Sequence, residues 1–165
     1  MKPLIFGALA GLAATMAMTA FMRRAHRHLP LDEQYPLPPR EIVDHTIHVE
    51  REEAARTATV LSHFGFGALA GSLYALSPVN RLGGPSYGLG VWAASYLGWL
   101  PAFRILAPAT EHPIQRNLLM LAAHVVWGAV LSRSLDELDA AGQAFGRAAG
   151  EARLPAERVE MENRT

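Results

Sequence analysis

The 165-residue chain contains no cysteine, which excludes disulfides, thiolate nucleophiles and iron–sulfur ligation. It also has no excess of either charge, because 15 basic residues balance 15 acidic ones, and this balance gives no reason to expect nucleic acid as a partner. The sequence lacks a His-Glu-x-x-His zinc motif, a Gly-x-Ser-x-Gly nucleophile motif and a glycine-rich phosphate loop. These absences favour a protein that is not an enzyme.

The chain is instead rich in long apolar segments. Half of its residues are hydrophobic, yet the mean hydropathy is only +0.11, because the charged residues concentrate in residues 23–56 and 133–165. A helix of about 20 apolar residues, rising ~1.5 Å per residue, covers a hydrocarbon core ~30 Å thick. The apolar segments therefore predict a bundle of four transmembrane helices, at residues 3–22, 57–77, 85–103 and 117–132.

The polar segments complete an all-α membrane protein. Residues 1–134 are expected to form one transmembrane domain, and residues 135–165 a polar C-terminal tail. In the connector 23–56, Pro39 stands near the first turn of a segment with one apolar and one polar face. This pattern predicts an interfacial helix from about Arg40 to Glu53, lying along the membrane surface with its apolar side towards lipid or the bundle.

Proline and arginine residues mark the ends of the predicted helices. Pro101 is expected to kink the third span near its end. Arg116 and Arg133 bound the fourth span, which is short, and both are expected to snorkel to the membrane surface. In the tail, an alanine-rich helix is expected as far as about Arg153, with a disordered end beyond Pro155.

The distribution of arginine predicts the orientation in the membrane. With four spans, the connector 23–56 and the loop between the third and fourth spans share one side. That side holds eight arginines, namely Arg23, Arg24, Arg27, Arg40, Arg51, Arg56, Arg104 and Arg116. The positive-inside rule then places the connector in the cytoplasm and both termini on the other side of the lipid bilayer.

A repeated hexapeptide suggests how the first two spans pack. Phe-Gly-Ala-Leu-Ala-Gly occurs at residues 6–11 and again at residues 66–71. Each copy contains Gly-x-x-x-Gly, the spacing that lets two membrane helices bring their backbones into contact. The glycines of one copy are expected to pack against those of the other, or against a second copy of the chain or another membrane subunit. The four glycines are Gly7, Gly11, Gly67 and Gly71.

Four short motifs also occur in the order seen in a family of small bacterial membrane proteins. They are a Gly/Ala-rich first span, Pro36-Leu37-Pro38-Pro39-Arg40, a histidine opening the second span (His63, ahead of Phe64 and Tyr74), and His124-Val125-Val126-Trp127. Over about residues 5–132 the chain resembles the YagU-type family of multi-pass inner-membrane proteins, although the basic, histidine-rich stretch 23–28 departs from the pattern. The resemblance implies a location in the bacterial inner membrane and carries over no catalytic residue.

His63 and His124 are the ionisable residues inside the predicted second and fourth spans. These spans run in the same direction, and the two residues lie about 9 Å and 12 Å into them at ~1.5 Å per residue, so both imidazoles are expected to share one pocket. Intramembrane ionisable residues are functional candidates. The pair could bind a haem as axial ligands, or act in a proton-linked or pH-sensing role. The third alternative is structural hydrogen bonding, with hydroxyl partners expected at Thr15, Thr19, Ser62 and Ser95.

A second pair of histidines has metal-ligand spacing. His45 and His48 are three residues apart on the expected connector helix, near Glu41 and Asp44, although such residues can equally form a solvated polar face. No cofactor other than haem is indicated. Two functions therefore remain open from the sequence. One is a structural or accessory component that packs through its glycine faces, and the other is a small proton-linked or haem-binding membrane protein.

Overall fold

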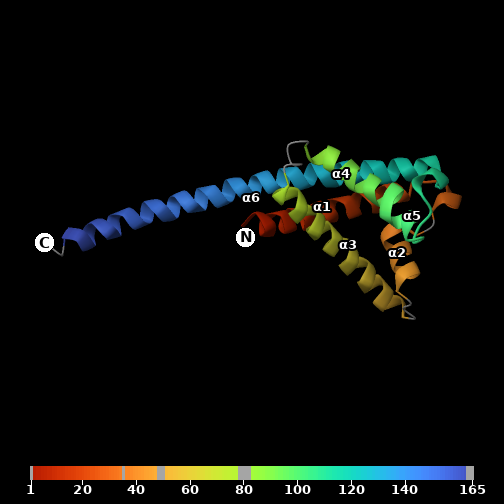
Figure 1. Ribbon diagram of the computed structural model, residues 1–165, viewed down its shortest axis with the longest axis horizontal. Coiled ribbons are helices and arrows are strands. Elements are labelled where there is room, and N and C mark those ends of the chain that lie inside the picture. The colour runs from red at the N-terminus through yellow and green to blue at the C-terminus, as the bar shows by residue number, and fades with distance from the viewer. Residues whose placement is uncertain (1, 35, 48–50, 78–82, 163–165) are drawn as a thin grey trace.

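The computed structural model describes residues 2–34, 36–47, 51–77 and 83–162, with side chains described as far as residue 147. Over these residues every element is a helix, in the order α1 (Lys2–His26), η1 (Leu31–Glu33), α2 (Pro38–Thr46), α3 (Glu52–Leu76), α4 (Gly84–Ala93), η3 (Ala94–Trp99), α5 (Leu100–Ala102), η4 (Ala109–Glu111) and α6 (Ile114–Glu162) (Figure 1). Three helices, α1, α3 and α6, are long and apolar enough to cross a membrane. The prediction of an all-helical chain with membrane-length helices is confirmed, with three such helices in the described part of the chain.

The repeated hexapeptides form the seam between α1 and α3. The two helices run antiparallel, with Gly7 facing Gly71 and Gly11 facing Gly67. A Cβ atom added at Gly7 would lie 2.6 Å from the carbonyl oxygen of Gly71, and one added at Gly71 would lie 2.8 Å from the Cα of Gly11. These separations leave no room for a side chain, so the glycines allow the two backbones to touch.

A second glycine seam joins α4 to α6, and these helices are also antiparallel. Gly84 and Gly88 have the same Gly-x-x-x-Gly spacing and lie against Gly128 and the backbone of His124. A Cβ atom at Gly84 would lie 2.8 Å from the carbonyl carbon of Gly128. Because α1 packs against both α3 and α6, it joins the two seams into one bundle.

The predicted third span is interrupted. α4 passes into the π-helical segment η3 and then into the short α5, and Gly98 within η3 has φ −112° and ψ −108°, which are not helical values. Pro101 explains the position of the break, because its ring crowds the carbonyl four residues earlier, at Leu97, and it has no N–H to donate to that carbonyl. The predicted kink is therefore found one turn before Pro101, and no single helix of membrane-spanning length covers residues 85–103.

The connector helix α2 differs from its prediction in length. It ends at Thr46, and Ile47 is extended (φ −125°, ψ 109°). Two consecutive β-branched residues explain this end, because their restricted side-chain rotamers lower the helix propensity. A new helix, α3, then starts at Glu52, so the single helix predicted over residues 40–53 is wrong beyond Thr46. Val43 on the apolar face of α2 is 1% exposed, which means that this face packs against the bundle.

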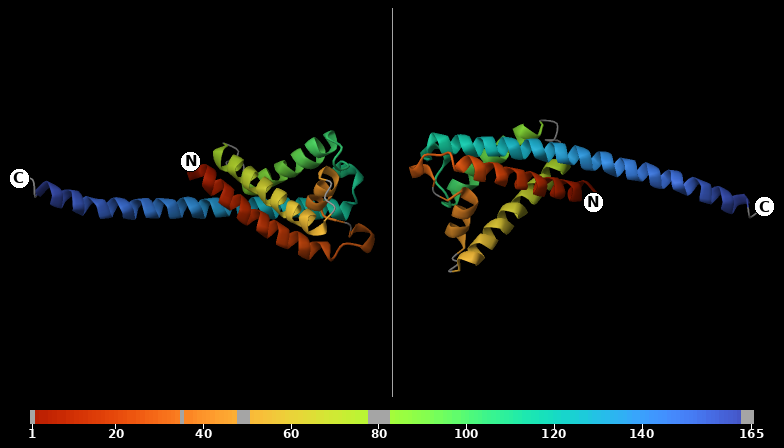
Figure 2. Two further views of the ribbon diagram at one scale, coloured as in Figure 1. Left: turned by 90° about the horizontal axis from the view of Figure 1, so that it is seen from below. Right: turned by 180° about the vertical axis from the view of Figure 1, so that it is seen from behind.

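The last helix, α6, is much longer than the predicted fourth span. Its 49 residues extend about 74 Å at ~1.5 Å per residue, and its C-terminal part projects away from the other helices in all views (Figure 1 and Figure 2). The disordered end predicted beyond Pro155 is wrong as far as Glu162, where the helix ends. Alanine, glutamate and arginine on both sides of Pro155 favour helix, although the proline itself removes one hydrogen bond.

Arg116, predicted to snorkel to the membrane surface, is instead 2% exposed, whereas Arg133 is exposed. The Arg116 guanidinium donates to the carbonyl oxygens of Glu33 (3.3 Å) and Pro36, and it forms an ion pair with Glu41 (3.2 Å). The connector folds back over the start of α6 and supplies the acceptors that a buried arginine requires. Arg116 therefore ties the connector to α6.

Beyond the glycine seams the helices diverge. α3 leans away from α1 and α6 towards the connector, and α2 stands between the separated ends (Figure 1 and Figure 2). Arg40 of α2 donates two hydrogen bonds to Glu52 at the start of α3 (2.9 and 3.0 Å) and also pairs with Asp44 (2.7 Å). These bonds to Glu52 and Asp44 raise the pKa of the Arg40 guanidinium above its usual value. The bundle is thus closed at one end and held open at the other.

Candidate functional site

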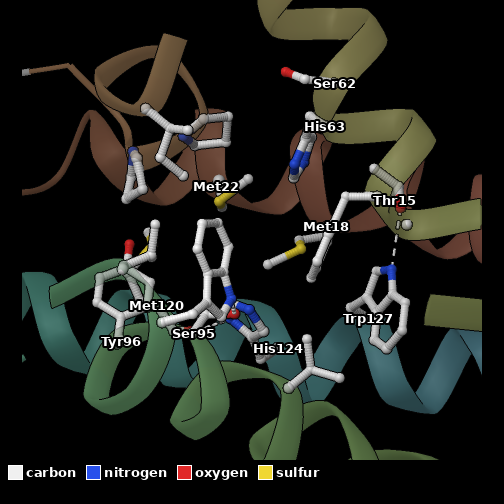
Figure 3. Close-up of a pocket in the computed structure, with 18 residues that line it drawn as sticks. Thr15, Met18, Met22, Ser62, His63, Ser95, Tyr96, Met120, His124 and Trp127 are labelled. Carbon is white, nitrogen blue, oxygen red and sulfur yellow. Dashed lines mark hydrogen bonds between the residues drawn. The ribbon is translucent and has the colours of Figure 1, made fainter. Parts of the chain in front are cut away.

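The separated helix ends enclose a cavity of about 230 Å³. Its walls come from α1, α2, α3, α6 and the segment from α4 to α5, and most of the lining is apolar. His63 on α3 and His124 on α6 project into it from opposite walls (Figure 3). The other polar residues in the lining include Thr15, Ser62, Ser95, Tyr96 and Trp127.

Helix register explains why both histidines reach this cavity. His63 lies four residues before Gly67 on α3, and His124 lies four residues before Gly128 on α6. Residues four apart share a helix face, so each imidazole stands one turn from a seam glycine, where the helices begin to separate. Both α3 and α6 run antiparallel to α1, which brings the two rings to the same end of the bundle, where both line the cavity.

The floor of the cavity is a hydrogen-bonded contact between α1 and α6. Thr15 Oγ1 donates to the carbonyl oxygen of Gly11 (2.8 Å) and accepts from Trp127 Nε1 (3.1 Å). Trp127 is 4% exposed, and its ring stacks on Tyr87 with ring centroids 6.0 Å apart. These residues use their hydrogen-bonding capacity within the protein and close the cavity towards the glycine seams.

The two histidines are bonded differently. His124 Nδ1 lies 2.8 Å from the carbonyl oxygen of Met120, and because a carbonyl only accepts, Nδ1 carries the proton of the neutral ring. His63 Nε2 is buried and has no hydrogen-bond partner among the described residues. The hydroxyls of Thr19 and Ser62, predicted as partners, bond main-chain carbonyls of their own helices (2.7 and 3.2 Å). A buried polar atom without a partner costs about 1–3 kcal/mol, so a bound molecule that supplied a hydrogen bond to His63 Nε2 would be stabilised there.

A second cavity, of about 360 Å³, adjoins the first beside the connector. His63, Met22 and Pro39 line both cavities, so these side chains stand between them. The second cavity also reaches His26 and Arg40. His63 can therefore be approached from the inner cavity and from the connector side.

The structure does not bring the candidate metal ligands together. His45 is exposed on α2, and His48 lies outside the described residues. Within the part of the chain that the structure describes, no group of three His, Asp or Glu side chains is arranged to hold a metal ion. The carboxylates of Glu41 and Asp44, expected near His45, each form an ion pair with an arginine.

Sequence reasoning missed the aromatic residues at the edge of the cavity. Phe66 of α3 and Trp99 of η3 line it with ring centroids 6.5 Å apart, and they are 45% and 37% exposed, so both also reach the outer surface. Trp99 Nε1 donates to Ser95 Oγ (3.3 Å), one turn earlier. The available signal was the spacing of Ser95, Tyr96 and Trp99, which places all three on one side of a helix.

The chain was compared with protein-family models, with curated proteins and with solved structures, and none of them matches. The resemblance to the YagU-type family therefore stays a prediction. What the protein does has to be inferred from the cavity and from the residues around it.

Proposed function

We propose that this chain is a non-enzymatic integral membrane protein that binds a small lipid-soluble molecule in the cavity between His63 and His124. The observation that carries this proposal is the buried Nε2 atom of His63, which faces the cavity and has no partner among the described residues. A molecule with a hydrogen-bonding group would satisfy this atom. Mostly apolar pockets with a few well-placed polar groups are the usual form of a small-ligand site.

The lining supports binding rather than catalysis. Among the described residues that form it there is no carboxylate, lysine or arginine. The hydroxyls of Thr15 and Ser62 donate to main-chain carbonyls of their own helices, so neither is held by a histidine as an activated nucleophile would be. The cavity is suited to holding a molecule in place.

The glycine faces support a bundle formed within one chain. The glycines predicted to pack are buried against one another between α1 and α3, so this surface is occupied without a second copy. A role as an accessory subunit is compatible with ligand binding, because α6 extends beyond the bundle and leaves Phe145 78% exposed. The proposal therefore concerns the cavity and does not depend on assembly.

We also propose that residues 84–102 cross the membrane as a fourth, interrupted span. α4, η3 and α5 follow one another directly (10, 6 and 3 residues) and together cover about 28 Å, close to the ~30 Å hydrocarbon core. Four spans place the connector and the loop before α6 on one side. The excess of arginine there favours the cytoplasmic side of the bacterial inner membrane.

The proposed function can be tested by identifying what co-purifies with the full chain in mild detergent. Organic extracts of the wild type would be compared by mass spectrometry with those of Val91→Phe, which adds a ring at a residue lining the cavity, and Val125→Phe, a matched change at a residue outside the lining. We expect one small molecule to be enriched in the wild type and in Val125→Phe and lost from Val91→Phe. The same extract profile from all three proteins would contradict the proposal.

A second candidate is a proton-linked or pH-sensing function, favoured by the position of His63 between two cavities. It predicts a pH-dependent change in tryptophan fluorescence that His63→Gln abolishes. A haem held by His63 and His124 is the remaining alternative, and a visible absorption spectrum of the same preparation would reveal it by a Soret band.

A further inference from the structure

The histidines of the cavity define the polar group of the ligand. His124 donates through Nδ1 to the carbonyl oxygen of Met120, so Nε2 is the acceptor of its neutral ring. His63 Nε2 can donate or accept, depending on the tautomer. A hydroxyl group suits this pair, because it donates one hydrogen bond to His124 and accepts another from His63. A carbonyl or ether oxygen only accepts and would leave the acceptor of His124 without a donor.

Aromatic side chains define the shape of the ligand. Phe66, Tyr96, Trp99 and Trp127 all line the cavity, and planar rings pack well in stacked or edge-to-face contact with such walls. The cavity volume of about 230 Å³ is below the roughly 300–1,000 Å³ of pockets for drug-sized molecules. One ring therefore fits inside, and a longer substituent has to extend out of the cavity.

The position of Phe66 and Trp99 indicates where such a substituent would go. Both residues line the cavity and are also partly exposed on the outer surface of the bundle. In a membrane-spanning bundle the surface at this level faces lipid, so an alkyl chain leaving the cavity beside these two rings would lie in the bilayer. The described lining contains no carboxylate, lysine or arginine, which favours a neutral ligand.

We infer that the cavity binds a neutral, lipid-soluble phenol with an alkyl chain, an inference that rests on the ligand-binding function proposed above. The phenolic hydroxyl lies between His63 and His124, and the ring packs against the aromatic walls. The alkyl chain leaves the cavity beside the paired rings of Phe66 and Trp99 and enters the bilayer. Recognition then depends on both the hydroxyl and the ring, and each can be removed from a probe separately.

Four probes test these two requirements: para-octylphenol, octylbenzene, para-octylanisole and tetradecanol. Each would be titrated into the full chain in lipid nanodiscs, with binding followed by the fluorescence of Trp99 and Trp127, which line the cavity. We expect para-octylphenol to bind about tenfold more tightly than octylbenzene or para-octylanisole, because each of these lacks the donor hydroxyl. Tetradecanol has the hydroxyl without the ring and is also expected to bind more weakly.

Variants of the two histidines test whether they bind the hydroxyl group of the probe. His63→Phe and His124→Phe are expected to reduce the affinity for para-octylphenol to that for octylbenzene, whereas His45→Phe, the same change at an exposed position outside the cavity, leaves it unchanged. If a cavity variant does not fold, the affinities of the wild type for para-octylphenol and para-octylanisole still test whether the hydroxyl group is recognised. Equal, saturable binding of the three ring compounds would overturn hydroxyl recognition and leave the proposed binding function in place. No saturable binding of any probe would count against both.

Discussion

Replacing Gly71 by alanine should force α1 and α3 apart. The new Cβ atom would lie 2.8 Å from the Cα and 3.0 Å from the amide nitrogen of Gly11, and it would overlap the carbonyl oxygen of Gly7. Carbon atoms pack best at about 3.5–4.0 Å, so the helices must separate by roughly 0.5–1 Å, which forfeits a quarter to a half of the dispersion attraction across the seam. We expect this overpacking to lower the free energy of unfolding by about 1–3 kcal/mol.

Gly65→Ala and Gly90→Ala are matched controls, because a Cβ atom at either position meets nothing within 4 Å. Alanine is favoured over glycine in a helix by up to about 1 kcal/mol, so these variants should be as stable as the wild type or slightly more stable. Unfolding would be followed by circular dichroism in detergent, with size-exclusion chromatography to detect assembly. If Gly71→Ala unfolded at the same midpoint as Gly65→Ala, backbone contact at the seam would not stabilise the bundle and the reasoning would be refuted.

Three further predictions concern the connector, the cavity floor and the orientation. Arg116→Met should lower the free energy of unfolding by about 3–5 kcal/mol, because it leaves Glu41 without its partner in a mostly buried ion pair. An unchanged unfolding midpoint would show that Arg116 does not stabilise the contact between the connector and α6. Trp127→Phe removes the hydrogen bond to Thr15 and should cost about 0.5–1.5 kcal/mol in the same assay. A single cysteine introduced at position 45 should react with an impermeant thiol reagent only once the cytoplasmic face is opened, and labelling from outside intact cells would reverse the orientation.

The seam between α1 and α3 could be predicted because its signal is local. The two hexapeptides give the spacing that brings backbones together, and the apolar runs around them give the helices. The same rule applied to Gly84 and Gly88 would have predicted the seam between α4 and α6. The similar depth of the two histidines in the bundle could also be predicted from the sequence, because each lies one helical turn before a seam glycine.

The connector and the cavity could not be predicted in the same way. The acceptors of Arg116 lie 75 to 83 residues away in the sequence, so nothing near this arginine indicates that it is buried. The cavity exists because α3 diverges from α1 and α6 and because η3 departs from regular helix, and the first of these features depends on contacts between distant segments. Pro101 predicted a kink near the end of the third span, but the π-helical turn and the non-helical backbone at Gly98 are seen only in the structure.

The seam between α1 and α3 is also a point about which α3 can rotate relative to α1. From Gly67 to its start at Glu52, α3 extends about 22 Å beyond the contact, at ~1.5 Å per residue, so turning it by about 5° would move that end by about 2 Å. The ion pair between Arg40 and Glu52 ties the N-terminal end of α3 to α2. We therefore expect the capacity of the cavity to depend on two contacts made by residues that are not in its lining, the backbone contact of Gly7 with Gly71 and the ion pair of Arg40 with Glu52.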